Sequence, residues 1–363
     1  MNFPKSDIRL FVMAGGGTGG HVLPLLAVAE ELRRRGHEVL FIGTKKGIEA
    51  RLVPAKGFSI EYIEIGGLKG LGAQRVLRTL WMLPASTLSV LARLRSLRPG
   101  AVFSMGGYVA GPVVLAALAL RIPVIAMEPN AVPGITNLRL GRFVRKTLLA
   151  FPETARYFPA GKTEVTGLPV REEFFAIPPR PRGPALRLLI TGGSGGSRTL
   201  NNAARQSWPL FRAAGFPIYI LHQTGRDAFE DTRTAFAKSG LDGEVVPFIE
   251  NMPQAFASSD LIVSRSGAGA VAELAAAGKP SILVPFPFAA DQHQLRNAEA
   301  FERAGAARMI ADKDMNGEKL FQAVTGLASQ PERMGAAART LAKPGAARRA
   351  ADLLEGCAAL NLE

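Results

Sequence analysis

Short apolar runs alternate with amphipathic stretches in the first half of the chain. Residues 23–35 have the spacing of an amphipathic helix that ends before a glycine. The apolar runs with the length and composition of buried strands are residues 8–14, 39–42, 101–104 and 124–127. Strands that alternate with helices in this way predict a parallel sheet.

The same pattern begins again in the second half. Residues 186–191 form an apolar run that leads into a glycine-rich segment. Pro169 and the proline cluster at 178–184 predict a stiff connection between the halves. Further strand-like runs cover residues 218–221, 244–246, 261–264 and 281–284.

We therefore predict an α/β protein of two doubly wound Rossmann-like domains facing a cleft, residues 1–169 and 170–345. The chain of 363 residues is long enough for two cores, and its 47% hydrophobic and 20% charged residues are typical of globular proteins. The final helical segment, 346–363, adds the hypothesis that the chain returns to the first domain.

Cysteine content and hydropathy bear on the compartment. Cys357 is the single cysteine, so neither an internal disulfide nor a cysteine-based metal site can form, which favours a reducing cytoplasm. Residues 1–7 lack the pattern of a signal peptide, so we expect no export. The longest apolar run, 109–120, is shorter than the roughly 18 residues of a membrane span and predicts a buried helix.

Positive charge is concentrated in one part of the chain. The net charge is +14, and between residues 65 and 152 Glu128 is the only acid among eleven Lys and Arg residues. Nucleic acid, an anionic membrane or a phosphate-rich substrate would each account for this surplus. No aromatic-interleaved basic motif supports nucleic acid, so we expect no nucleic-acid partner.

The stretch 68–98 favours a membrane surface. It could lie on anionic lipid, with basic side chains attracted to headgroups and apolar ones entering the boundary. The alternative is an ordinary core-facing helix with a solvated face. The residues concerned are Leu77, Leu80, Trp81, Met82 and Leu83, mixed with Lys69, Arg75, Arg78, Arg93, Arg95 and Arg98.

Three glycine-rich segments follow predicted strands. Gly15, Gly17 and Gly20 fit the dinucleotide pattern GxGxxG between a strand and a helix, where backbone amides can receive phosphate. The others are Gly106-Gly107 and residues 192–196. A nicotinamide enzyme would carry an acid after its second strand, but this strand ends in Gly43-Thr44, which weakens the oxidoreductase alternative. Turns that need glycine only for geometry remain the other alternative.

Two familiar motifs are excluded or disfavoured. Gly161-Lys162-Thr163 lacks the glycine of a Walker loop, because Arg156 stands in that position. Asp312-Lys313-Asp314 has the form of a metal-binding acidic pair, but its charged surroundings favour a solvated turn. We therefore expect no metal and no cofactor.

Residues 264–273 form the most specific stretch. They place small residues at a helix start, where a diphosphate would sit, with Glu273 about one turn later. Glu273 could accept hydrogen bonds from ribose hydroxyls, and Arg265 could offset negative charge nearby. The alternative for Glu273 is compensation of the helix dipole.

At this point the sequence closely resembles the MurG family, which transfers N-acetylglucosamine from UDP to a lipid-linked muramyl peptide. The resemblance spans nearly the whole chain. It rests on residues 16–24, 106–112, 192–194 and 265–268, on Asn201 and Glu273, and on residues 291–297.

The resemblance implies a two-Rossmann glycosyltransferase fold of the GT-B type, with UDP-N-acetylglucosamine held mainly by the second domain and the lipid I acceptor by the first. It also implies a location at the cytoplasmic face of the plasma membrane. The implied donor contacts are Ile249 for uracil, Glu273 for ribose, Ala268, Gly269, Ala270, Val271 and Ala272 for the diphosphate, Ser194 and Arg171 for phosphate, Gln294 with His293 for the sugar, and Thr18, Gly19, Gly20 and Asn130 on the first-domain side; Gly106, Gly107 and Tyr108 lie on the acceptor side.

The implied reaction is an inverting displacement by the acceptor's 4-hydroxyl. His21 is the leading candidate for the general base, with binding of the acceptor diphosphate as its alternative role, and Glu128 is the reserve base. A related transferase with another lipid acceptor is the nearest competing hypothesis. The chain departs from the family pattern at Met127, Pro129, Leu168, Gly195, Ala270 and Ala272, so side chains at these positions are not expected to be essential.

Overall fold

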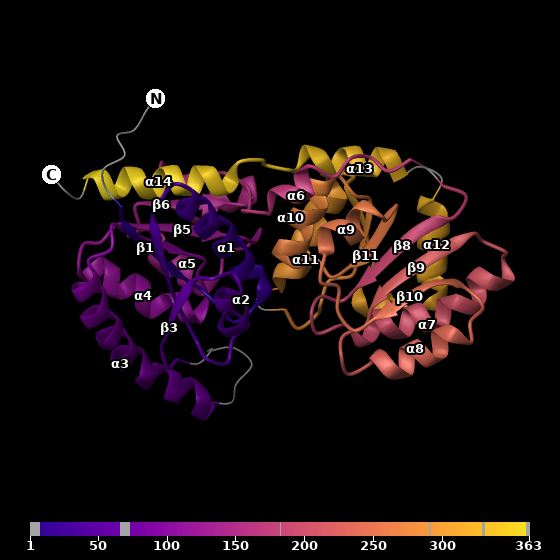
Figure 1. The fold of residues 1–363 in the computed structure, drawn as a ribbon, viewed down its shortest axis with the longest axis horizontal. Coiled ribbons are helices and arrows are strands. Elements are labelled where there is room, and N and C mark those ends of the chain that lie inside the picture. The colour runs from indigo at the N-terminus through magenta and orange to yellow at the C-terminus, as the bar shows by residue number, and fades with distance from the viewer. Residues whose placement is uncertain (1–7, 66–72, 182, 290–291, 329–330, 361–363) are drawn as a thin grey trace. The chain divides into compact units, whose positions relative to one another are not determined.

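The computed structural model describes residues 8–65, 73–181, 183–289, 292–328 and 331–360. The chain forms two compact units (Figure 1). The first comprises Met1–Val170 together with Gly345–Glu363, and the second comprises Arg171–Pro344.

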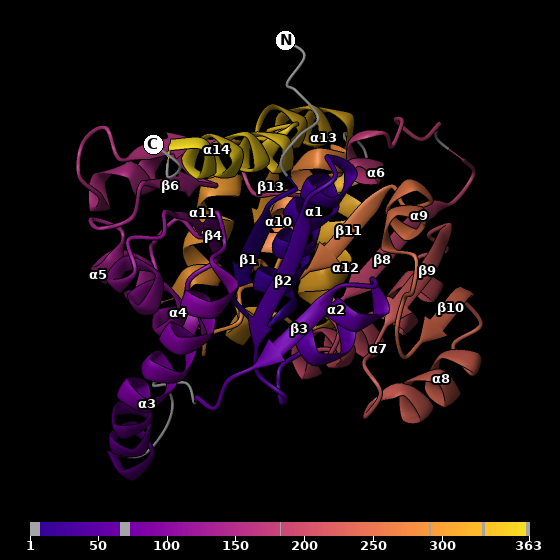
Figure 2. The same cartoon turned by 60° about the vertical axis from the view of Figure 1, so that its left-hand side comes forward.

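The first unit is built on a seven-stranded sheet of parallel pairs in the order β3-β2-β1-β4-β5-β6-β7. Figure 2 shows β1, β2 and β3 side by side. The strands are β1 (Leu10–Ala14), β2 (Glu38–Gly43), β3 (Ser59–Tyr62), β4 (Ala101–Ser104), β5 (Val124–Glu128), β6 (Lys146–Leu149) and β7 (Thr163–Val165). The helices are α1 (Gly19–Arg34), α2 (Glu49–Ala55), α3 (Ala73–Leu97), α4 (Gly107–Ala119), α5 (Ile135–Leu140), the 3-10 helix η1 (Pro152–Tyr157) and α14 (Ala346–Leu360).

The second unit repeats this plan with a six-stranded parallel sheet in the order β10-β9-β8-β11-β12-β13. Its strands are β8 (Leu186–Thr191), β9 (Ile218–Gln223), β10 (Asp242–Val246), β11 (Leu261–Ser264), β12 (Ser281–Leu283) and β13 (Ala307–Met309). Its helices are α6 (Glu172–Phe175), α7 (Arg198–Ala213), α8 (Phe229–Ala237), α9 (Met252–Ala257), α10 (Ala268–Ala277), α11 (His293–Arg303), η3 (Asp312–Asp314), α12 (Gly317–Leu327) and α13 (Pro331–Thr340).

Burial explains why the central strands are continuous apolar runs. β4, β5 and β11 are buried at every position because helices cover both faces of a parallel sheet. In each sheet the strand order reverses next to the first strand, at β1/β4 and at β8/β11. Ligands of doubly wound folds bind at the carboxyl ends of the strands beside such a reversal.

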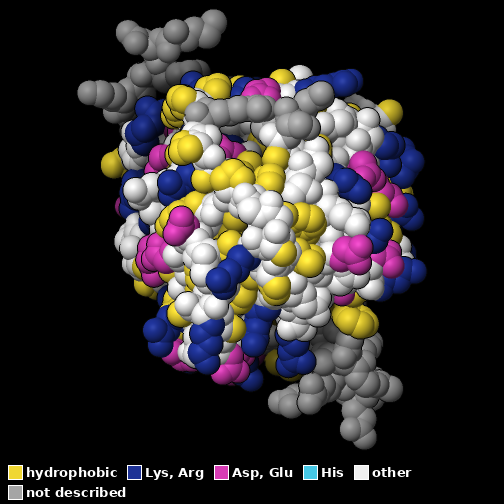
Figure 3. Space-filling model, turned by 90° about the vertical axis from the view of Figure 1, so that its right-hand side faces the viewer, with side chains coloured by type: hydrophobic (Ala, Val, Ile, Leu, Met, Phe, Trp, Pro, Cys, Tyr) yellow, Lys and Arg dark blue, Asp and Glu magenta, His cyan; other side chains and the backbone are white. Residues whose placement is uncertain are grey.

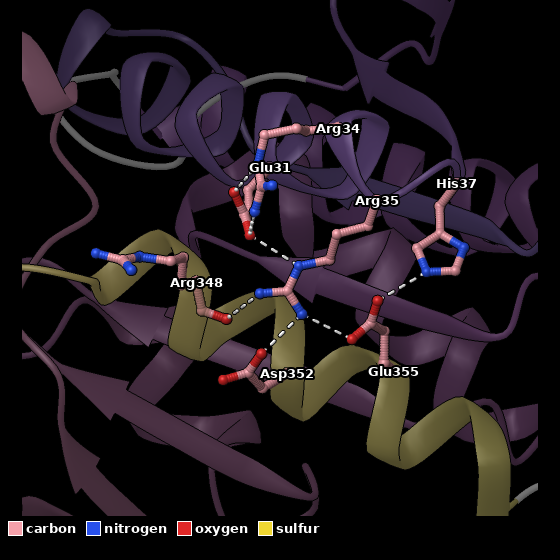
Figure 4. A network of polar contacts seen from close by, with 7 residues as sticks. All are labelled: Glu31, Arg34, Arg35, His37, Arg348, Asp352 and Glu355. Carbon is pink, nitrogen blue, oxygen red and sulfur yellow. Dashed lines mark hydrogen bonds and ion pairs between the residues drawn. The ribbon is translucent and has the colours of Figure 1, made fainter. Parts of the chain in front are cut away.

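The helix α14 is part of the first unit, where it packs on α1 and β4. Arg35 at the end of α1 donates to Asp352 and Glu355, both at 2.7 Å, and Nε2 of His37 lies 2.8 Å from the Glu355 carboxylate (Figure 4). Leu354 is fully buried on the apolar side of the same helix. The C-terminal helix α14 therefore completes the core of the first unit.

Several predicted elements differ from the observed ones. Helix α1 begins at Gly19, four residues before the expected start, so the last glycines of the loop form its first turn. The short strands β3, β6, β7 and β13, each of three or four residues, were not predicted. The apolar run 109–120 forms the largely buried α4, as predicted.

The described residues also show how charge is distributed on one face and how apolar the helices are. Lys and Arg side chains are interspersed with Asp and Glu side chains on the face drawn in Figure 3, so the net positive charge is not concentrated there. No helix in the described part of the chain combines the length and hydropathy that crossing a membrane requires.

Candidate active site

The loop after β1 delivers backbone amides to the start of α1. Gly17 has φ +85°, a conformation that favours glycine, and Thr18 is the extended residue before the helix. The amides of Gly19 and Gly20 lie in the first turn, where α-helical geometry provides no carbonyl acceptor. The predicted first-unit donor contacts Thr18, Gly19 and Gly20 therefore form one anion-receiving turn.

Glu49 binds this loop through its side chain, a contact that was not predicted from the sequence. Its buried carboxylate accepts hydrogen bonds from the amide of Gly17 at 2.8 Å and from the amide and hydroxyl of Thr44 at 2.9 and 2.8 Å. The sequence signal was indirect: a Cβ at Gly16 or Gly47 would overlap this carboxylate, so glycines surround it.

His21 occupies the third position of α1. Its Nδ1 lies 3.3 Å from the carbonyl oxygen of Gly16. Burial lowers the pKa of His21 below its usual 6.5, while the Gly16 carbonyl and the Glu49 carboxylate oppose that shift. A carbonyl can only accept, so in the neutral imidazole Nδ1 carries the proton and Nε2 keeps the lone pair.

The loop after β4 lies beside His21. Gly106 and Gly107 have φ of +72° and +77°, and a Cβ added at Gly107 would lie 3.5 Å from Cε1 of His21. Tyr108 reaches the first loop, because a Cβ at Gly17 would lie 3.2 Å from its ring. The structure thus brings the predicted acceptor-side residues Gly106, Gly107 and Tyr108 together with the candidate base.

Glu128, the reserve base, ends β5 and is buried. Its carboxylate accepts from the amide and side chain of Asn130 at 3.0 and 3.3 Å, from the Gly134 amide at 3.1 Å and from the Asn137 side chain at 2.9 Å. Burial raises its pKa to about 7, although these donors favour the anion. All four acceptor positions of the carboxylate are occupied, so its visible role is to shape the turn that carries Asn130.

The glycine loop after β8 is narrow. A Cβ at Gly196 would overlap the backbone of Thr224, so only glycine fits there. Ser194 is exposed at the tip of this loop, consistent with the phosphate contact expected of it. Ser197 caps α7 by accepting from the Leu200 amide at 3.3 Å.

Gln223 links this loop to the predicted uracil residue and was also missed from the sequence. Its amide nitrogen donates to Gly193 O at 2.7 Å and to Thr191 Oγ1 at 3.1 Å. Its amide oxygen accepts from the Ile249 backbone amide at 2.8 Å. Ile249 is therefore held against the glycine loop through one buried side chain.

The segment before α10 supplies a second anion-receiving turn. Gly267 precedes the helix, and the amides of Ala268, Gly269 and Ala270 lie in its first turn. The Val271 amide already donates to Gly267 O at 3.0 Å. Five residues were predicted to bind the diphosphate. Ala268, Gly269 and Ala270 present backbone amides at the start of the helix, whereas Val271 and Ala272 lie further along it.

Arg265, expected from the sequence to offset negative charge nearby, binds groups of the protein itself. Its guanidinium donates to Asp312 at 2.5 Å, to Ser197 at 2.7 Å and to the carbonyls of Val284 and Pro285 at 3.0 and 3.3 Å. The prediction of a solvated turn is accordingly wrong for Asp312, because this partly buried residue anchors Arg265. The pair joins the segments that follow β11 and β13, and Arg265 also binds carbonyls of the segment after β12.

Glu273 and Arg171 form the charged part of the site in the second unit. Glu273 Oε1 lies 3.7 Å from Arg171 Nη2, and burial raises the pKa of Glu273 to about 7 against the attraction of that guanidinium. Glu273 is the sixth residue of α10, beyond the first turn where a helix dipole acts strongly, so dipole compensation does not explain it. Arg171 Nε is buried without a hydrogen-bond partner in the described structure.

Gln294 lies near the start of α11. Its side-chain oxygen accepts from the Phe286 amide at 3.0 Å, and its carbonyl accepts from Ser266 Oγ at 2.7 Å. The neighbouring His293 begins the helix, whereas residue 291 of the same motif lies outside the described residues. Within the described residues, no group of three or more His, Cys, Asp and Glu side chains could hold a metal ion.

Comparisons with known proteins agree with this architecture. Residues 11–149 match the glycosyltransferase family 28 N-terminal domain, and residues 187–354 match the family's C-terminal domain. The chain is similar to the UDP-N-acetylglucosamine--N-acetylmuramyl-(pentapeptide) pyrophosphoryl-undecaprenol N-acetylglucosamine transferase of Solibacter usitatus, with 64% identity over 95% of each chain. The protein of that name from Anaeromyxobacter sp. is 42% identical over 96% of this chain and 93% of its own.

Among solved structures, the crystal structure of Acinetobacter baumannii MurG superposes with a TM-score of 0.79. It is 35% identical in sequence, and the alignment covers 96% of this chain and 99% of that one. The chain therefore belongs to glycosyltransferase family 28 and, within it, to the MurG family of transferases.

Proposed function

We propose that this chain transfers N-acetylglucosamine from UDP-N-acetylglucosamine to the 4-hydroxyl of N-acetylmuramic acid in undecaprenyl-pyrophosphoryl-MurNAc-pentapeptide, lipid I. The product is lipid II, an intermediate of peptidoglycan synthesis. The observation that carries this proposal is the 64% sequence identity, over 95% of the chain, with the Solibacter transferase, whose name states both substrates. The geometry of each unit supplies the chemistry that such a transfer needs.

The second unit binds the donor in this proposal. The backbone of Ile249 contacts uracil, and the Glu273 carboxylate accepts from ribose hydroxyls. The first-turn amides of Ala268, Gly269 and Ala270 receive the diphosphate, whose negative charge a helix N-terminus favours. Arg171 and Ser194 add phosphate contacts, and Gln294 with His293 contacts the sugar hydroxyls.

The first unit binds the acceptor and supplies the base. His21 Nε2 takes the proton of the 4-hydroxyl while that oxygen bonds to the anomeric carbon. The bond from the anomeric carbon to phosphate oxygen breaks at the same time, and its electron pair leaves with UDP, so the configuration inverts. Gly106, Gly107 and Tyr108 contact the acceptor.

Thr18, Gly19, Gly20 and Asn130 keep their proposed donor contacts. The charge that develops on the leaving group is met by helix-terminal amides and by the Arg171 guanidinium. Glu128 shapes the turn that carries Asn130, and we therefore assign the base to His21.

Peripheral association with the anionic cytoplasmic surface of the plasma membrane is part of the proposal, because the acceptor is lipid-linked. Described residues of α5 and the following turn support it. Ile135, Leu138 and Phe143 are 51%, 45% and 54% exposed. The neighbouring Arg139, Arg142 and Arg145 are also exposed, which combines apolar anchors with basic charge.

The stretch 68–98 contributes less to this argument. Residues 68–72 and the side chains of residues 73–81 lie outside the described part of the structure. Of the rest, Arg95 and Arg98 are exposed, whereas Arg93 pairs with Glu61. Binding to vesicles with and without anionic lipid tests the membrane proposal, and the triple variant I135S/L138S/F143S should bind anionic vesicles less than the wild type.

The transfer itself is tested with radiolabelled UDP-N-acetylglucosamine and a short-chain lipid I analogue. The wild type should form labelled product, Glu273→Ala should abolish it, and Glu230→Ala on the exposed face of α8 should leave it unchanged. Transfer to a diacylglycerol but not to lipid I would instead favour a related transferase with another lipid acceptor.

A further inference from the structure

Glu49 is a buried acidic side chain of the first unit. It begins α2, is 1% exposed, and no Lys or Arg in the described structure pairs with it. Its three hydrogen bonds come from Gly17 and Thr44, and all three partners are donors. Burying a carboxylate is costly unless other groups pair with it or donate hydrogen bonds to it.

Glycines make the space for this carboxylate. A Cβ at Gly16, Gly43 or Gly47 would fall within overlap distance of the Glu49 side chain. Gly16 and Gly47 have no positive φ, so backbone conformation does not explain why glycine stands there. Close approach of Glu49 to the backbone of two loops is the explanation that the contacts give.

The hydrogen bond to Gly17 also determines what the first loop can offer. Glu49 Oε2 occupies the Gly17 amide, so phosphate can reach only the later amides of the turn. The carbonyl of the adjacent Gly16 is the group that accepts from His21 Nδ1. Glu49 thus binds the residue next to the carbonyl that engages His21 Nδ1.

We infer that Glu49 is a positioning residue of the transfer reaction. It holds the Gly16-Gly17 turn so that Gly16 O engages His21 Nδ1 and Nε2 remains free to take the acceptor's proton. The inference rests on the proposed function, because the role of His21 as base belongs to it. Supporting groups of this kind hold the groups that carry out the chemistry in their productive geometry.

Glu49→Gln is the informative change because it is isosteric. An amide has one acceptor oxygen and one donor nitrogen, so either Gly17 or Thr44 would face a second donor in place of an acceptor. Thr44→Val is the matched control: it removes one hydrogen bond to Glu49 Oε1 and leaves the bond to Gly17. Gly47→Ala is a second probe, which displaces the carboxylate without removing its charge.

The experiment compares kcat, the KM of each substrate, the Kd of UDP and the thermal midpoint of all four proteins. We expect kcat to fall by about 10- to 100-fold in Glu49→Gln and to fall in Gly47→Ala. The Kd of UDP should change much less than kcat, because most of its proposed contacts lie in the second unit. Thr44→Val should keep the wild-type kcat even where its thermal midpoint falls.

The pH profile gives a readout that a purely structural role would not move. Glu49 is the charged group that raises the pKa of His21, and the phenol ring of Tyr108 flanks the loop from α4. Removing the negative charge should therefore shift the acid limb of kcat/KM to lower pH in Glu49→Gln.

Three results would overturn the inference: a wild-type kcat in Glu49→Gln, an unmoved acid limb, or equal losses of kcat in Glu49→Gln and Thr44→Val. If Glu49→Gln does not fold, a wild-type kcat in Gly47→Ala overturns it instead. Failure of the proposed function is a separate outcome, because the wild type itself would then transfer no sugar to lipid I.

Discussion

Nη2 of Arg171 lies 3.7 Å from Oε1 of Glu273, near enough for attraction but longer than a hydrogen bond. Arg171 Nε is buried without a partner in the described structure, and its guanidinium carbon lies 5.0 Å above the ring of Phe174. A buried donor without a partner has a free-energy cost that a ligand oxygen would remove. Arg171 can therefore still donate a hydrogen bond to an anion, and the Glu273 carboxylate can accept hydrogen bonds from hydroxyl groups.

Arg171→Ala should weaken UDP binding. Hydrogen bonds to charged groups contribute roughly 1.5 to 3 kcal/mol, so we expect the Kd of UDP to rise by about 10- to 150-fold. Isothermal titration calorimetry measures this directly. Arg233→Ala, an exposed arginine on α8, is the control, and an unchanged Kd in Arg171→Ala would remove this residue from the donor site.

Glu273 should make UDP binding depend on pH. Its pKa is raised to about 7 in the ligand-free chain, and ribose hydroxyls bind the ionised carboxylate. Affinity should therefore decline as pH falls below about 7, approaching a tenfold loss per pH unit for one proton. Glu273→Gln should bind more weakly above pH 7, and the two proteins should converge as Glu273 becomes protonated at lower pH. The variant should also lack this component of the pH dependence, while the titration of UDP itself remains in both proteins.

His21→Ala should lower kcat by about 10²- to 10⁴-fold, the usual contribution of a general base. The base must be neutral, and burial lowers its pKa, so wild-type kcat at saturating donor should decline only below pH 6.5. The pH dependence of kcat, measured with saturating UDP-N-acetylglucosamine so that the titration of Glu273 does not limit binding, checks the second statement. If His21→Ala instead raises the KM of the lipid acceptor at constant kcat, the histidine binds the acceptor diphosphate.

Glu128 should make the folded first unit less stable as pH rises. Its pKa is about 7 in the folded chain and 4.5 ordinarily, so the folded state binds the extra proton between these values. The free energy of unfolding should therefore decrease from about pH 4.5 to pH 7, by up to about 3 kcal/mol from this group. Subtracting the curve of Glu128→Gln isolates the effect, and identical pH dependence in both proteins would contradict it.

Local sequence signals predicted the strand ends and glycine loops well. Strands β4, β8 and β11 match their predicted ranges, because buried parallel strands are continuous apolar runs. Helix α1 was predicted to start too late, because glycines such as Gly19 and Gly20 are poor helix formers in general. In the first turn the low helix propensity of glycine matters little, and the backbone amides there can bind an anion.

Contacts between distant loops could not be predicted from one sequence. Glu49 and Gly17 are 32 residues apart, and Arg265 and Asp312 are 47 apart. Nothing in their spacing distinguishes them from solvated charges, because only the packing of loops at the strand ends brings them together. Asp312 was assigned to a solvated turn for this reason, and Gln223 was overlooked as an ordinary polar residue.

The ion pairs of Arg35 with Asp352 and Glu355 of α14 join residues 317 and 320 positions apart within one unit. During synthesis, α1 leaves the ribosome long before Asp352 and Glu355 exist, and the whole second unit is made in between. The surface beneath α14 therefore stays uncovered until the end of the chain is made, at a stage when the second unit can already fold. Its final closure is a late, long-range step of maturation, although its first strand is among the earliest segments made.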